Sequence, residues 1–305
     1  MRALFDRLRQ RLPTTVDRRV IGLAIATLIV QVLIVGTGGA VRLTGSGLGC
    51  PTWPRCTDDS FIATPEMGIH GIIEFGNRML TFVLVIVAIL TFLSVLRMRR
   101  SRPELFRLAF VIGLLVPIQA VLGGITVLTN LNPWIVGLHF LPSVVMVCLA
   151  VVYLWRVVDG PAAGTFSAPT ALRILVHVTS AALAITILAG VLTTGSGPHA
   201  GDHGSARNGL DPEFMQHLHS WPAYAALAGT VAVLVWALVL RATRIVRWAG
   251  VLLLVEGAQI VVGITQARVG LPPLLVGIHM VLAVVAAGAL TALVLSLSPR
   301  RSADA

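Results

Sequence analysis

The residues of this chain best suited to chemistry are histidines that stand inside long apolar stretches. His139 and His279 each lie near the start of one such stretch, and His219 lies near the start of another. An ionisable group inside an apolar span is costly and marks a functional site by default. Four-helix bundles build cofactor sites from facing helices, and imidazoles are axial ligands of haem iron. The sequence therefore predicts that His219 and His279 hold a haem iron between two helices.

A second polar group stands at the start of the second apolar stretch. Helical spacing places Glu74, Asn77 and Arg78 on one face, with His70 a turn above them. Together with His139, this group offers one imidazole and a carboxylate. An iron bound by a single imidazole is more open to reactants, which suits a reaction better than electron storage. The alternative is a structural ion pair between Glu74 and Arg78 at the membrane edge.

Two further ionisable residues leave choices open. His217 competes with His219, but the two are about 200° apart around a helix and cannot both point inward. Glu256 lies deep in the seventh apolar stretch, where it could relay protons or pair with a polar neighbour.

The chain contains an internal duplication. QAVLGGIT at 119–126 reappears as QIVVGIT at 259–265, VGLH at 136–139 as VGIH at 276–279, and TGSG at 44–47 as TGSG at 194–197. Aligning the two copies favours His219 over His217 as the residue that points inward. In the same alignment Asn77 corresponds to His219. Each half therefore contributes one polar cluster near the same ends of its helices.

The composition shows which elements must position these residues. Of 305 residues, 56% are apolar and 12% charged, about half of the charge of an ordinary soluble domain. This excludes a soluble enzyme, a disordered chain and a disulfide-rich secreted module. A membrane span needs roughly 20 apolar residues, and eight stretches qualify: about 20–41, 70–96, 108–128, 135–155, 172–193, 213–240, 248–267 and 273–297.

The arginines orient the spans. All 23 basic residues are arginine, and 18 of them lie in one set of loops, together with the two ends of the chain. The positive-inside rule then places both termini in the cytoplasm of a multi-pass plasma-membrane protein, with loops 42–69 and 194–212 facing outward. Because topology accounts for the basic charge, no nucleic-acid partner is expected.

These observations predict an all-α integral membrane protein whose eight transmembrane helices form two tandem four-helix bundles, related by a pseudo-two-fold axis along the membrane normal. The expected division is a cytoplasmic segment 1–19, an N-terminal half 20–156, a cytoplasmic linker 157–172, a C-terminal half 173–297 and a cytoplasmic tail 298–305.

Two cysteines stand close together in the first outward loop. Cys50 and Cys56 lie in an oxidising compartment, and the two prolines between them favour closure of a short disulfide ring. Two unpaired thiols are the alternative.

With these residues in view, the chain resembles the haem A synthase family. The likeness rests on the 4+4 duplication, the loop RLTGSGLGCPTWPRC at 42–56, Glu74, and the histidines at 139, 219 and 279, and it covers nearly all of 18–297. The loop cysteines and the absence of lysine suggest a bacterial member of actinobacterial type.

The resemblance implies an oxidoreductase that converts the C8 methyl of haem O to a formyl group, giving haem A for terminal oxidase assembly. It implies that His219 and His279 ligate a resident haem b. It places His139 in the pocket for the substrate haem, makes Glu74 catalytic, and assigns Cys50 and Cys56 to a redox-relevant disulfide.

One position departs from the family pattern, since many relatives carry histidine where this chain has Asn77. The substrate haem then has only His139 as a protein ligand, or His70 takes over. The expected partners are membrane lipid, haem O and haem A, together with a haem O synthase and oxidase assembly factors.

Two rival functions remain at this point. The first is a quinol-linked electron-transfer cytochrome with bis-histidine haem b and no chemistry on the haem. The second is a transporter whose histidines carry protons.

Overall fold

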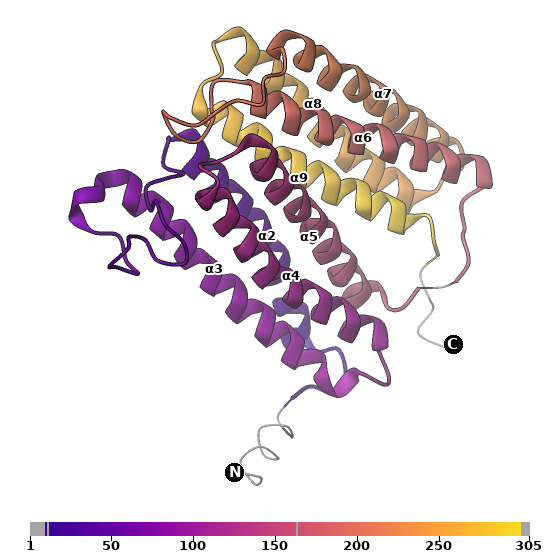
Figure 1. Cartoon of the computed structure of the whole chain (residues 1–305). Helices are drawn as coiled ribbons and strands as arrows, with labels where there is room; N and C mark the ends of the chain where they lie inside the picture. The colour runs from indigo at the N-terminus through magenta and orange to yellow at the C-terminus, as the bar shows by residue number, and fades with distance from the viewer. Residues whose placement is uncertain (1–9, 11, 163, 300–305) are drawn as a thin grey trace.

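The computed structural model describes residues 10, 12–162 and 164–299 (Figure 1). Within them the chain forms long α-helices and two short 3-10 turns, and contains no strand. The long helices are α2 (Arg18–Leu43), α3 (Gly68–Val95), α4 (Pro103–Leu128), α5 (Pro133–Asp159), α6 (Thr170–Ser196), α7 (Pro212–Val239), α8 (Thr243–Arg268) and α9 (Pro273–Ser296). The 3-10 turns are η1 (Pro65–Met67) and η2 (Leu96–Met98).

All eight long helices are long and apolar enough to cross a membrane. The predicted spans are therefore confirmed, each within a few residues of its helix. Most of the predicted segment 1–19 and of the tail 298–305 lies outside the described residues.

Local sequence explains where the helices begin. The carboxylate of Asp17 accepts hydrogen bonds from the backbone N–H groups of Arg19 and Val20 at the start of α2. Asn132 and Asp211 cap α5 and α7 in the same way. Such caps satisfy donors that a helix leaves without partners in its first turn.

The helices form two groups of four that lie side by side, α2–α5 and α6–α9 (Figure 1). In each group the first helix packs on the second, the second on the third, the third on the fourth, and the fourth on the first. Between the groups, α2 contacts α9, α5 contacts α6, and α5 contacts α9. This set of contacts fits a duplicated unit related by a two-fold axis.

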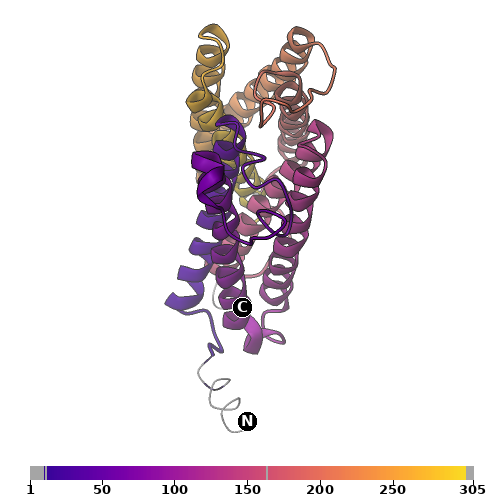
Figure 2. The ribbon, with the colours of Figure 1, turned by 60° about the vertical axis from the view of Figure 1, so that its left-hand side comes forward.

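The chain reversals define two ends of the molecule. Segments 44–64 and 197–211 lie at one end, which we term the loop end, and α2 begins and α9 finishes at the opposite, terminal end (Figures 1 and 2).

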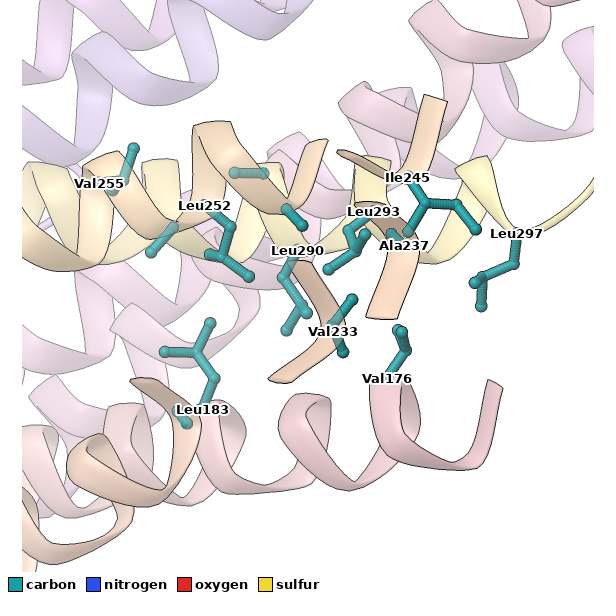
Figure 3. Close-up of a cluster of buried hydrophobic side chains, with 14 of the residues drawn as sticks. Val176, Leu183, Val233, Ala237, Ile245, Leu252, Val255, Leu290, Leu293 and Leu297 are labelled. Carbon is teal, nitrogen blue, oxygen red and sulfur yellow. The ribbon is translucent and has the colours of Figure 1, made fainter. Parts of the chain in front are cut away.

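Apolar packing is densest toward the terminal end of both halves. In the C-terminal half, Val176, Ala237, Ile245 and Leu293 are buried together, and Figure 3 shows these side chains converging from all four helices. In the N-terminal half the corresponding cluster centres on Val20, Met98, Leu105 and Tyr153. Burying this much apolar surface fixes the helices at one end and leaves the loop end to carry polar groups.

The two halves meet along α9, which is the most buried of the spans. Small residues such as Ala286, Ala287 and Gly288 let its backbone approach the neighbouring helices closely. At the loop end Arg42 joins the halves, because its guanidinium donates to the carbonyls of His199 and Thr194 at 2.8 and 3.2 Å.

Candidate functional site

A cavity of about 1330 Å³ opens between the helices toward the loop end, and residues of both halves line it. Eight of the candidate residues named from the sequence lie on its wall: Glu74, Asn77, Arg78, His139, His217, His219, Glu256 and His279. The volume exceeds that of an ordinary small-molecule pocket, roughly 300–1,000 Å³. The cavity therefore has room for a ligand larger than a typical metabolite.

The C-terminal half brings two imidazoles face to edge. The ring of His219 on α7 lies 6.0 Å from the ring of His279 on α9, centre to centre, with the planes inclined by 75°. Nδ1 of His219 donates a hydrogen bond of 2.8 Å to the backbone carbonyl of Thr186 on α6. With Nδ1 protonated, Nε2 keeps its lone pair, which is the usual arrangement for a metal-ligating histidine.

These two imidazoles fit a haem iron. Iron–nitrogen bonds of roughly 2 Å on opposite sides of one atom place two imidazole centres roughly 6 Å apart, as observed. No group of three or more His, Cys, Asp or Glu side chains placed to hold a metal ion occurs among the described residues.

Three of the histidines that line the cavity each face a glycine of the neighbouring helix. A β-carbon at the glycine would lie 2.9–3.3 Å from Cε1 of the ring, closer than ordinary van der Waals contact. The pairs are Gly123 with His139, Gly190 with His219, and Gly263 with His279. The absence of a side chain at these glycines makes room for the imidazoles, so each helix hairpin is shaped to hold one ring.

In the N-terminal half, Glu74 is 5% exposed and fully engaged. Its Oε2 accepts a hydrogen bond of 2.5 Å from the backbone N–H of Cys50, and its Oε1 forms an ion pair of 2.6 Å with Arg78. The ion pair that the sequence offered as an alternative is thus present. Arg78 also donates to the carbonyls of Cys50, Thr52 and Arg55, and so fastens the loop between α2 and α3 over Glu74.

His139 lies across the same cavity without a second imidazole. Nδ1 of His139 is buried without a partner in the described structure, and its backbone carbonyl accepts a hydrogen bond of 3.0 Å from Gln119. Asn77 lines the cavity and its Oδ1 accepts a hydrogen bond of 2.7 Å from Thr37. This half therefore offers one imidazole, an amide and a carboxylate, in contrast to the imidazole pair of the other half.

Neither alternative histidine, His70 or His217, joins the imidazole pair. Nδ1 of His70 is 2.8 Å from Oγ of Ser46, and the ring lines a second, smaller pocket in place of the main cavity. His217 does line the main cavity, but its ring packs near Trp221, and it is His219 that meets His279.

The loop between α2 and α3 carries the disulfide Cys50–Cys56, and we call residues 48–56 the disulfide loop. Trp53 lies on the cavity wall against Gly124, where a β-carbon would come within 3 Å of the indole ring. Gly49 runs directly against the backbone of α3, so only glycine fits there. Together with Arg78, these contacts seat the loop on the N-terminal half of the cavity.

Several of these features were not predicted from the sequence. The glycines at 123 and 263 stand inside the repeated segments, so a pairing of glycine with histidine could have been suspected. The hydrogen bond to the carbonyl of Thr186 and the position of Trp53 against Gly124 depend on how neighbouring segments pack. No local sequence pattern predicts either of them.

Fold and site together define a helical integral membrane protein with a large cavity lined by both four-helix groups and an imidazole pair in one of them. Comparison with known proteins makes the assignment more specific. The chain belongs to the COX15-CtaA family of cytochrome oxidase assembly proteins, whose family model matches residues 22–294.

The chain is also similar to curated proteins named haem A synthase. It is 30% identical to that of Listeria welshimeri over 132 residues, which are 43% of this chain and 42% of the relative. The protein of Bacillus pumilus is 34% identical over 122 residues, covering 39% of this chain and 38% of the relative. That of Geobacillus thermodenitrificans is 30% identical over 112 residues, covering 37% and 34%. The matched segments thus span less than half of the relatives' length.

Proposed function

We propose that this protein is a haem A synthase, which oxidises the C8 methyl of haem O to a formyl group and so supplies haem A for assembly of a terminal oxidase. Membership of the COX15-CtaA family supports this assignment, as does the similarity to haem A synthases. The observation that carries it is the pairing, in one cavity, of two histidines suited to a resident haem with a buried carboxylate opposite a lone histidine.

The resident cofactor in this proposal is haem b, held by His219 and His279. A haem held by these two histidines would supply electron transfer, since His219 and His279 together would leave its iron closed to other ligands. The hydrogen bond from His219 to the carbonyl of Thr186 orients that ring toward the cavity. Gly190 and Gly263 give the two rings the space they occupy.

Haem O is the substrate and occupies the N-terminal half, beside His139. Asn77 and Trp53 line that part of the wall, and the disulfide loop covers it and limits access of water. Conversion of a methyl to an aldehyde replaces hydrogen on that carbon by an oxygen atom from O₂ or from water, so protons must be moved at the reacting carbon in either case. Glu74 is the carboxylate placed to accept or relay these protons, a role typically worth about 10²–10⁴-fold in rate.

The orientation and partners belong to the same proposal. The asymmetry of the arginines places both termini in the cytoplasm and the disulfide loop outside the plasma membrane. A haem O synthase must supply the substrate and oxidase assembly must consume the product.

The test is analysis of haems bound to the protein purified from cells that make haem O. The wild-type protein is expected to contain haem b and to yield haem A. Glu74→Ala is expected to retain the haem b spectrum and accumulate haem O, while His279→Ala is expected to lose the low-spin haem b signal.

Glu104→Ala is the matched control, because Glu104 is also paired with an arginine but lies at the terminal end. A normal yield of haem A from Glu74→Ala would remove Glu74 from the mechanism. Unmodified haem in every variant and in the wild type would favour the electron-transfer cytochrome, and a colourless wild-type protein would favour a transporter.

A further inference from the structure

Arginines gather around the mouth of the cavity. Five arginines lie in or beside the segments at the loop end, and four of them line the cavity: Arg42, Arg78, Arg207 and Arg268. The fifth, Arg55, lies off the cavity wall, over the ring of Phe61.

The two arginines of the N-terminal half are already committed to the protein. Arg42 donates to the carbonyls of His199 and Thr194, and Arg78 donates to Glu74 and to three carbonyls of the disulfide loop. A guanidinium has five donors in a fixed fork, and these contacts direct both forks toward the protein. Neither side chain is free to receive a ligand without breaking the structure around it.

The two arginines of the C-terminal half are differently placed. Arg207 and Arg268 are exposed, and within the part of the chain that the structure describes neither side chain has a hydrogen bond, ion pair or ring contact. Arg268 stands in the last turn of α8, where the helix dipole favours a cation. Glu213 lies on the same wall but pairs with neither of them. Two unengaged guanidinium groups thus flank the half that holds the imidazole pair.

The position of Arg268 relative to the imidazole level is set by the helix. Gly263, against which the ring of His279 packs, precedes Arg268 by five residues, which corresponds to an axial rise of about 7.5 Å. Arg268 therefore lies beyond the imidazoles toward the loop end. A ligand centred between the two rings would meet the arginines with the edge that faces the loop end.

Haem carries two carboxylates on one edge, and a free guanidinium is the group best suited to bind a carboxylate through paired hydrogen bonds. We propose that Arg207 and Arg268 bind the two carboxylates of the resident haem and turn its carboxylate edge toward the loop end. Among the described residues that line the cavity, the N-terminal half has no unengaged arginine, so a haem bound there is held less firmly and exchanges as a substrate and product must. This inference rests on the proposed function, and in particular on a haem at His219 and His279.

The test measures the rate at which haem b leaves the purified protein for excess apomyoglobin. Exposed pairs of opposite charge contribute modestly, so Arg207→Gln and Arg268→Gln are each expected to speed haem loss about 2- to 5-fold, and the double variant about tenfold. Arg55→Gln is the matched control, because Arg55 lies at the same end without lining the cavity. It is expected to lose haem at the wild-type rate.

A second arm uses protein reconstituted with the dimethyl ester of the same haem, which lacks the carboxylates. The ester is expected to leave the wild-type protein and the double variant at equal rates. The inference would be overturned if the double variant lost haem at the wild-type rate. It would also be overturned if the double variant lost haem and its ester with the same acceleration, a result that would point to a structural role or to anionic lipid at these arginines. A wild-type protein that binds no haem would overturn the proposed function along with it.

Discussion

The contact between Gly190 and His219 gives the most direct test of the imidazole pair. Replacement of Gly190 by alanine adds one methyl group, and its carbon would lie 2.9 Å from Cε1 and 3.0 Å from Nδ1 of His219. Carbon atoms reach optimal separation at about 3.5–4.0 Å. The ring must therefore retreat by roughly half an ångström, and it can do so only by straining its 2.8 Å hydrogen bond to Thr186.

Overpacking of this kind typically costs about 1–3 kcal/mol. The added methyl destabilises the conformation in which His219 lies beside His279. Because that conformation binds the haem, we expect the substitution to lower the affinity for haem. On that basis Gly190→Ala should weaken retention of haem b by roughly 5- to 150-fold.

The assay is the haem content of purified protein, with the low-spin spectrum read by absorption and by electron paramagnetic resonance. Gly250→Ala in α8 is the control, since its added methyl would meet no atom within 4 Å. That change should leave haem content unaltered and favour the helix slightly, because alanine is the better helix former. Full haem content and an unchanged low-spin signal in Gly190→Ala would refute the idea that this glycine shapes the ligand's position.

Three further outcomes follow from other contacts. Arg42→Gln should lower the free energy of unfolding by about 1–3 kcal/mol, measured by thermal unfolding in detergent, because the carbonyls joining the halves lose a charged donor. Gly124→Val should expel Trp53 and increase trypsin cleavage in the disulfide loop, whereas Gly113→Val, with open space around it, should not. Replacing both loop cysteines by serine should reduce haem A yield while sparing haem b, because the loop backbone that donates to Glu74 loses its covalent ring.

Much of the architecture could be predicted from the sequence, because a membrane span is encoded by length and hydropathy alone. The eight stretches correspond to α2–α9, and polar or turn-forming residues such as Asp17, Asn132 and Asp211 explain several boundaries. The duplication was also visible, since its repeated glutamine and histidine keep the same spacing. The duplication favoured His219 over His217, and in the structure the ring of His219 lies beside that of His279.

Other parts of the site could not be predicted, because they depend on backbone atoms and on packing between distant segments. The spacing of Glu74 and Arg78 indicated an ion pair, but nothing indicated that Cys50 would donate its backbone N–H to the same carboxylate. His70 stands one turn from Glu74 in sequence, yet the approach of Gly49 to α3 turns it toward Ser46 and away from the cavity.

The disulfide loop is the feature by which the two halves differ most, and it explains how one unit could give two sites. Both halves use a helix hairpin in which glycine faces histidine. In the N-terminal half the disulfide loop binds the carboxylate of Glu74 and places Trp53 against Gly124, whereas the loop 197–211 of the other half contacts its helices through Asn208. The loop and the carboxylate hold each other in place, so neither could be gained alone without leaving a buried polar group unsatisfied. A reactive site in one copy and an electron-transfer site in the other would then result from what was added at the loop end, while the helices kept their common packing.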